Sequence, residues 1–127
     1  MRAPSETFES KAFARWLQRQ MQAGVLLFSK IPIGDSTLSG EEGKKLYHMG
    51  VRRGVPDFVI VHIATRKVLW VEMKREQGGV LSAYQKAWKS ALGPSAAVAY
   101  GFKDAKAITV EWLYARGFET RDRRSGA

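Results

Sequence analysis

The sequence predicts an α/β fold in which a mixed central β-sheet is flanked by helices. Apolar periodicities alternate along the chain in the order helix, strand, strand, strand, helix, strand, helix. Two neighbouring strands joined by a short turn predict an antiparallel hairpin, and a later strand follows a helical crossover, so one sheet should contain both kinds of pairing. At 127 residues the chain is long enough for one hydrophobic core, and we expect a single domain over residues 1–127.

The first half of the chain predicts a helix, a strand and a long connection. Residues 5–22 form the helix, with Ser5 as its cap and Gly24 as its stop. Its apolar stripe consists of Phe8, Ala12, Phe13, Trp16, Leu17 and Met21. Residues 25–33 predict the first strand, which leads into a Gly-rich connection with a short helix near 41–49. A connection of this length is more often functional or mobile than inert.

The second half predicts a hairpin, a helix, a strand and a final helix. Residues 56–64 and 67–74 form the hairpin, and 80–94 form a helix with a capping box from Ser82 and Gln85. Residues 95–102 predict the next strand and 104–118 the last helix. The tail of about 119–127 is basic and polar, and we expect it to be flexible.

Composition restricts the partners and the chemistry. The formal net charge is +9, from 21 basic and 12 acidic side chains, and this favours a polyanion, with nucleic acid ahead of a membrane surface. Cysteine is absent and there are only two histidines, so a bound metal would be held by oxygen. No apolar run is long enough to span a bilayer and none resembles a targeting segment, so we expect a cytoplasmic protein without a membrane partner.

The segment WVEMKRE, residues 70–76, places Glu72 and Lys74 two positions apart on a predicted strand. Residues two apart on a strand point the same way, so this carboxylate and this ammonium can converge. If the hairpin loop has an even number of residues, Asp57 on the preceding strand faces Glu72 or Lys74. The alternative is an exposed ion pair at a sheet edge, with Asp57 as a turn residue after proline.

Two neighbouring strand carboxylates suggest a divalent cation, because an uncompensated pair would strongly raise the pKa of one of them. Asp57, Glu72 and a main-chain carbonyl such as that of Met73 are suitable oxygen ligands for Mg²⁺. Glu6 or Glu9 could add a carboxylate, because both fall on the apolar stripe of the first helix. For Glu6 the alternative role is a first-turn acid that favours the helix dipole.

Three stretches together resemble one known family. GVPDFVIV, WVEMKR and LSAYQKAW are similar to motifs of the VRR-NUC (virus-type replication-repair nuclease) family, within the PD-(D/E)xK nuclease superfamily. The resemblance covers most of the chain and implies a restriction-endonuclease-like sandwich. It implies metal ligands at Asp57 and Glu72, a catalytic Lys74, an assisting Gln85 and a first-helix acid at Glu6. The family often has Pro-Asn-Gly where this chain has residues 32–34 as Pro-Ile-Gly.

The resemblance implies a Mg²⁺-dependent DNA endonuclease in which Mn²⁺ can replace Mg²⁺. Similarity to compact virus-type members suggests a homodimer that acts on branched DNA in repair, like a Holliday-junction resolvase, in a bacterial or phage-infected cell. The alternatives are a flap or nicking nuclease and a catalytically silent basic DNA-binding protein. Five basic residues are candidates for contacts with the DNA backbone: Lys44, Lys45, Arg52, Arg53 and Arg75. Trp88 is expected in the core rather than in base stacking.

Overall fold

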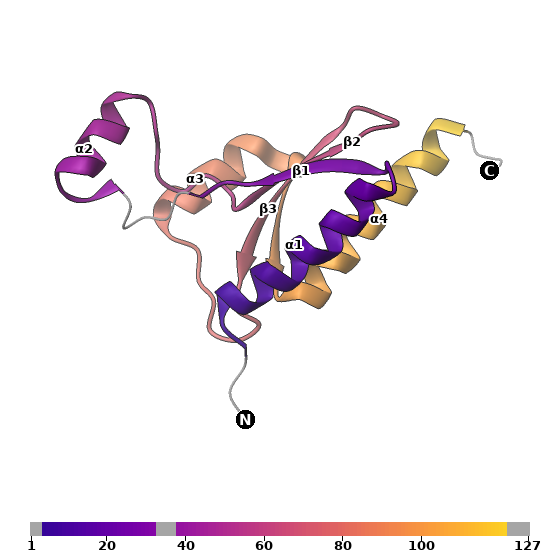
Figure 1. Ribbon diagram of the computed structural model, residues 1–127, viewed down its shortest axis with the longest axis horizontal. Coiled ribbons are helices and arrows are strands. Elements are labelled where there is room, and N and C mark those ends of the chain that lie inside the picture. Colours follow the sequence, from indigo (N-terminus) through magenta and orange to yellow (C-terminus); the bar gives the residue numbers. More distant parts are fainter. Residues whose placement is uncertain (1–3, 33–37, 122–127) are drawn as a thin grey trace.

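The computed structural model describes residues 4–32 and 38–121. In chain order its elements are α1 (Glu6–Gln22), β1 (Leu26–Lys30), α2 (Gly40–His48), β2 (Phe58–His62), β3 (Val68–Lys74), α3 (Ala83–Leu92), the short 3₁₀-helix η2 (Gly93–Ser95), β4 (Ala96–Tyr100) and α4 (Phe102–Arg121). The predicted α/β class and the order of elements are confirmed (Figure 1).

The four strands form one mixed sheet in the order β1-β2-β3-β4. β2 pairs antiparallel with both β1 and β3, whereas β3 and β4 are parallel. In the hairpin, Phe58 is opposite Val71 and Ile60 is opposite Leu69. All four of these side chains are buried, so the apolar face of the sheet determines how the two strands align.

The hydrophobic core lies between one face of the sheet and the pair α1 and α4, which run side by side across it (Figure 1). From β3, Leu69, Val71 and Met73 point into this core, while the alternate residues point to the other face. α1 contributes Phe13, whose ring packs edge-on against the ring of Phe58 at 5.0 Å. The side chains of the alternate residues of β3 are therefore directed to the face on which α3 lies.

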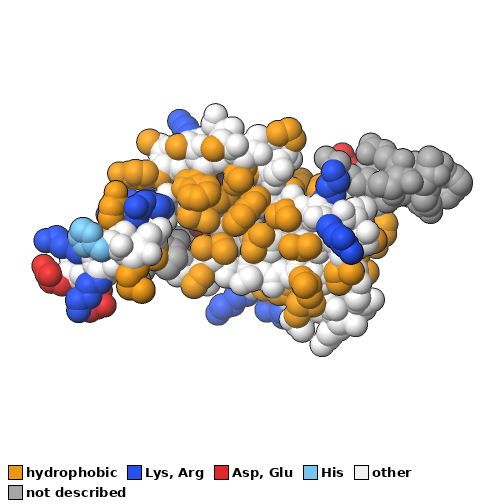
Figure 2. Space-filling view, turned by 90° about the horizontal axis from the view of Figure 1, so that it is seen from above, with side chains coloured by type: hydrophobic (Ala, Val, Ile, Leu, Met, Phe, Trp, Pro, Cys, Tyr) orange, Lys and Arg blue, Asp and Glu red, His pale blue; other side chains and the backbone are white. Residues whose placement is uncertain are grey.

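The described helices leave part of that second face uncovered. α3 packs against β4 and η2, and no described helix lies over the cross-strand row of Leu27, Val61 and Val68. Leu27 is 53% exposed and Val68 is also exposed. Figure 2 shows hydrophobic side chains gathered over the middle of the molecule in this view, with charged side chains at the end formed by α2.

Most of α1 follows the prediction, but its first turn does not. Ser5 caps the helix by accepting a hydrogen bond from the backbone N–H of Phe8, and Phe13 is fully buried. Phe8 itself is 57% exposed, so its predicted place in the buried stripe is wrong. The reason is that Glu9 takes the buried position at this level of the helix, where it meets the start of α4.

Several predicted boundaries also differ, most of them because the elements are shorter than predicted. α4 begins at Phe102 rather than at residue 104 and continues to Arg121, so residues 119–121 of the tail expected to be flexible are helical. Residues 122–127 and Ile33, the last residue of the first predicted strand, lie outside the described residues. Within the described ranges, no helix is both long and apolar enough to cross a bilayer. The expectation of one domain stays a prediction.

Glu9 links α1 to α4, and we predict that this contact stabilises the fold. Its Oε1 accepts a hydrogen bond of 3.1 Å from the backbone N–H of Phe102, and the carboxylate is 5% exposed. Glu9→Ala should lower the free energy of unfolding by about 1–2 kcal/mol, because a buried helix-start N–H loses its acceptor. Urea denaturation followed by circular dichroism measures this. Glu9→Gln keeps an acceptor and is the matched control, and equal stability of all three proteins would contradict the prediction.

Candidate metal centre

Three carboxylates from separate elements meet at one edge of the sheet. Glu6 is the first residue of α1, Asp57 directly precedes β2, and Glu72 lies in β3. One oxygen from each lies within 4.8 Å of the others, so the three side chains could hold a metal ion. An all-oxygen set suits hard divalent cations such as Mg²⁺. Of the two acids considered on the first helix, Glu6 joins the cluster, whereas Glu9 contacts the start of α4.

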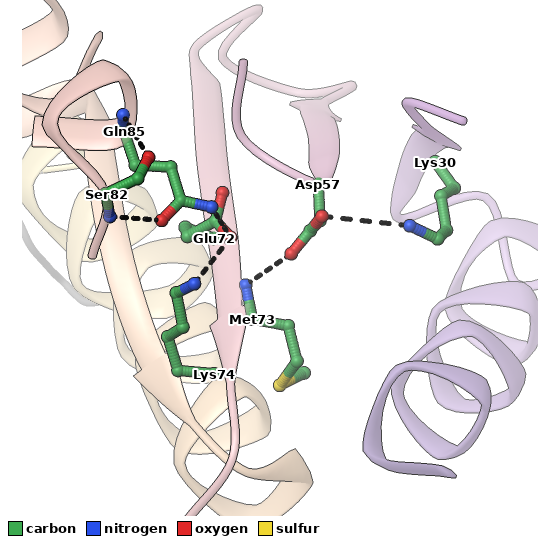
Figure 3. Close-up of polar contacts among 7 residues, drawn as sticks. All are labelled: Lys30, Asp57, Glu72, Met73, Lys74, Ser82 and Gln85. Atoms are coloured by element: carbon green, nitrogen blue, oxygen red, sulfur yellow. Dashed lines mark hydrogen bonds and ion pairs between the residues drawn. The ribbon is translucent and has the colours of Figure 1, made fainter. Parts of the chain in front are cut away.

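Asp57 is held by both neighbouring strands (Figure 3). Its Oδ2 accepts a hydrogen bond of 2.8 Å from the backbone N–H of Met73, and its main-chain carbonyl accepts one from Ile31 N–H at 2.6 Å. The ammonium of Lys30, at the end of β1, lies 3.8 Å from Oδ1. Lys30 was not among the residues predicted from the sequence. The available signal was that it ends the first strand at the edge where Asp57 begins the second.

Glu72 and Lys74 point to the same side of β3, as the strand spacing predicted. Their charged atoms are 3.9 Å apart, and the side chains are only 7% and 11% exposed. The alternative of a solvent-exposed ion pair is therefore wrong, since both side chains are largely buried. The nearby Gly79 is a residue that the sequence analysis missed. A Cβ at that position would lie 2.8 Å from the Cβ of Lys74, so the loop can cover the lysine only if residue 79 has no side chain.

Gln85 makes contacts with both the helix cap and the carboxylate cluster. Its backbone N–H donates to Ser82 Oγ and its Oε1 accepts from Ser82 N–H, which completes the predicted capping box of α3. Because Oε1 is engaged in this way, Nε2 is directed at Glu72 and donates a hydrogen bond of 3.1 Å to its Oε2 (Figure 3). The start of α3 thus orients one carboxylate of the cluster.

Burial gives the cluster unusual acid–base properties. Burial raises the pKa of Glu72 to about 9, and the negative charge of Asp57 and a hydrogen bond with it add to this, against an opposing effect of Lys74. The pKa of Glu6 is also raised, chiefly by burial, with Lys74 again opposing. Without a cation, the cluster therefore retains a proton that an exposed carboxylate would lose. A divalent cation is the kind of ligand that would offset this repulsion.

The structure does not bring the five basic residues proposed for DNA contacts together. Lys44 and Lys45 lie on α2, at the end of the molecule away from the sheet, and each pairs with a glutamate one turn earlier (Figure 1). Arg75 is exposed and follows Lys74 in the chain. Its positive charge partly opposes the rise in the pKa of Glu6, so it lies close to the carboxylate cluster. Arg52 lies against the ring of Tyr47, which is also on α2, and Arg53 lies against the ring of Tyr84 on α3.

Comparison with known proteins identifies the type of fold. No family model and no curated protein matches the sequence. A solved structure described as "VRR_NUC domain protein" matches with a TM-score of 0.68, over 89% of this chain and 91% of that chain, at 20% sequence identity. The chain therefore has the VRR_NUC fold, a four-stranded mixed sheet flanked by helices of the restriction-endonuclease-like kind. The resemblance inferred from the sequence motifs is confirmed at the level of the fold.

The raised pKa of Glu72 predicts an inverse dependence of stability on pH in the metal-free protein. The folded state holds the proton on Glu72 more tightly than the unfolded chain, so its contribution to stability is present below about pH 4.5 and is lost as pH rises towards about 9. Glu72→Gln removes this titration. In EDTA, the variant should melt at about the wild-type temperature at pH 5 and about 5 °C or more above it at pH 9.

Circular dichroism melts at pH 5, 7 and 9 measure this difference. Glu111→Gln, an exposed acid on α4, is the control for loss of one negative charge. Parallel pH profiles for wild type and Glu72→Gln would contradict the assignment of a buried, proton-retaining carboxyl to Glu72.

Proposed function

We propose that this chain is a metal-dependent DNA endonuclease that hydrolyses phosphodiester bonds. The observation that carries the proposal is the meeting of Glu6, Asp57 and Glu72 beside Lys74 on a VRR_NUC fold. The name of the matching structure denotes a nuclease domain, and the motifs of this sequence resemble the same family at the positions that converge. The net charge of +9 also favours a polyanionic substrate.

The proposed metal ligands are Asp57, Glu72 and Glu6, with the main-chain carbonyl of Met73 as a further oxygen. Mg²⁺ is the proposed ion, and Mn²⁺ would substitute because it accepts the same oxygen ligands. A divalent ion bound there would polarise the scissile phosphate and lower the pKa of a water. Asp57 is already oriented for this role by the Met73 N–H, and Glu72 by the amide of Gln85.

Lys74 is proposed as the catalytic residue that is not a metal ligand. Its ammonium is buried next to Glu72, where it would orient the attacking water or neutralise negative charge developing on the phosphate. Gln85 is a positioning residue, because it acts through the carboxylate of Glu72. Lys30 approaches Asp57 from the other side and is half exposed, so it is available to a phosphate as well as to the carboxylate.

A groove beside the cluster offers an approach for the DNA backbone. It has a volume of about 330 Å³ between α1 and the end of β1, and its lining includes Glu6 and Asp57. Lys11 and Lys30 supply positive charge on its walls, and Ser10 supplies a hydroxyl. Phosphate contacts of this kind position a nucleic acid without reading its sequence.

The proposed substrate is branched DNA, and the proposed active form is a homodimer that presents two sites to a junction. The family resemblance supports both proposals. The uncovered apolar row of Leu27, Val61 and Val68 adds a surface on which a second copy would bury hydrophobic area.

Replacing Asp57 or Lys74 should abolish cleavage. Asp57→Asn and Lys74→Met keep the approximate shape of each side chain but remove a ligand charge and the ammonium, and each should lower the cleavage rate at least about 100-fold. Cleavage of four-way junction, flap, linear and supercoiled DNA is followed on gels with Mg²⁺, Mn²⁺ or EDTA. Asp57→Asn should also reduce the rise in melting temperature that Mg²⁺ gives the wild type.

The matched controls are Glu111→Gln and Lys106→Met, which change exposed residues of α4 and should keep wild-type rates. Cleavage that persists in EDTA, or that proceeds at nearly the wild-type rate in Asp57→Asn, would refute the proposed centre. DNA binding by the wild type without any cleavage would identify a silent DNA-binding protein instead, and a preference for flap or nicked DNA would replace the junction proposal.

The proposed homodimer predicts a light-scattering mass of about twice the 14.2 kDa chain at micromolar concentration. Leu27→Glu would place a charge on the uncovered apolar row and should shift the protein towards the monomer. A wild type that remains monomeric across this concentration range would contradict the dimer while leaving the metal centre unaffected.

A further inference from the structure

A second cavity lies outside the carboxylate cluster, between α3 and the connection that contains α2. Its volume is about 300 Å³, and its principal lining residues are Tyr47, Arg52, Arg53, Tyr84 and Trp88. We call it the arginine–tyrosine pocket. None of these side chains belongs to the cluster of Glu6, Asp57 and Glu72. A volume of this size is at the lower end of the range for small-ligand sites.

The chemistry of the pocket combines exposed aromatic surface with positive charge. Tyr84 is 54% exposed and Tyr47 is 50% exposed, so neither ring is part of the core. The guanidinium of Arg52 lies 4.0 Å from the centre of the Tyr47 ring, and that of Arg53 lies 5.8 Å from the Tyr84 ring. Aromatic rings that stack on bases, next to arginines that attract phosphates, are the features by which proteins bind unpaired nucleic acid.

The pocket is fixed by hydrogen bonds and close packing. Trp88 Nε1 donates a hydrogen bond of 3.0 Å to the main-chain carbonyl of Arg53. Trp88 therefore lines the pocket, and the prediction that it lies in the core is wrong. Arg52 donates to the carbonyl of Tyr47 at 2.8 Å. Gly54, at φ +86°, lies so close to α3 that a Cβ would be 2.4 Å from the backbone of Tyr84. A preformed pocket of this kind loses little entropy when a ligand binds.

Each wall of the pocket contains a residue that is close in sequence to a residue at the carboxylate cluster. Tyr84 precedes Gln85, whose amide donates to Glu72 from the start of α3 (Figure 3). Arg53 precedes Asp57 by four residues, which limits the separation of their Cα atoms to about 14 Å. A DNA strand bound at the cluster would therefore reach the pocket within a few nucleotides.

We propose that the arginine–tyrosine pocket binds an unpaired nucleobase of the DNA strand that is cut at the carboxylate cluster. The base stacks on Tyr84, and Arg52 and Arg53 hold the adjoining phosphates. This inference rests on the proposed function and adds a substrate feature to it, because a base paired within a duplex cannot leave its stack to enter the pocket without cost. DNA with unpaired bases a few nucleotides from the cut is the preferred substrate class.

The experiment measures binding without cleavage, by fluorescence anisotropy in EDTA, of a labelled oligonucleotide whose single-stranded tail adjoins a short duplex that fixes the position of the strand on the protein. A series of oligonucleotides carries one abasic position that is moved along the strand. The wild type should bind about 5- to 100-fold more weakly when one particular base is missing. Tyr84→Ala should bind the intact strand more weakly by a similar factor and should not respond to the abasic position. Tyr84→Phe should behave like wild type, because the stacking surface is kept.

Tyr114→Ala is the matched control, because Tyr114 is exposed to a similar degree on α4, and it should bind like wild type. A wild type that tolerates every abasic position equally would overturn the proposal without the use of any variant. The proposal would also be overturned if the abasic position weakened binding equally in the wild type and in Tyr84→Ala. It would likewise be overturned if free dTMP bound as tightly as the strand. Because binding is measured without cleavage, the result can be interpreted even if the protein has no nuclease activity. If Tyr84→Ala left cleavage unchanged, the proposal for the pocket would be wrong, whereas the proposed nuclease function would stand.

Discussion

The antiparallel alignment of β2 and β3 is the constraint on which the carboxylate cluster depends. Phe58 is opposite Val71, and Asp57 is one residue further towards the edge, beside Glu72. A slip by one residue would turn Glu72 into the hydrophobic core and break the contact between Asp57 and the Met73 N–H. The alignment is enforced by the apolar side chains that α1 and α4 cover, so the packing of one face of the sheet determines the geometry of its polar edge.

This polar edge is costly for the folded protein. Glu72 is buried, its pKa is raised to about 9, and its polar contacts include an ammonium at 3.9 Å, an amide at 3.1 Å and a hydrogen bond with Asp57. Buried carboxylates with such limited compensation are unusual in a purely structural role, and natural proteins tend to retain them where a ligand is bound. α3 connects this cluster to the arginine–tyrosine pocket, because two consecutive residues contribute to different sites. Gln85 donates a hydrogen bond to Glu72, and Tyr84 lines the pocket.

The sequence was sufficient to predict much of the candidate site. The convergence of Glu72 and Lys74 follows from the two-residue period of a strand, and the position of Asp57 follows from the parity of a short hairpin loop. Lys30 could not be found in the same way, because its contact with Asp57 depends on where β1 ends relative to β2. Gly79 was missed for a related reason, since its close approach to the lysine is a property of a folded loop.

Features that depend on neighbouring residues could be predicted from the amino-acid sequence. These include the caps of α1 and α3 at Ser5 and Ser82 and the α/β order of elements. Only the tertiary structure showed that Glu6, the acid implied by the family resemblance, reaches the carboxylate cluster, because Glu6 and Glu9 are close in sequence and both fall on the predicted stripe. It also placed Trp88 against Arg53 rather than in the core. Local patterns report the periodicity of a segment, whereas these outcomes depend on how helices distant in sequence pack against the sheet.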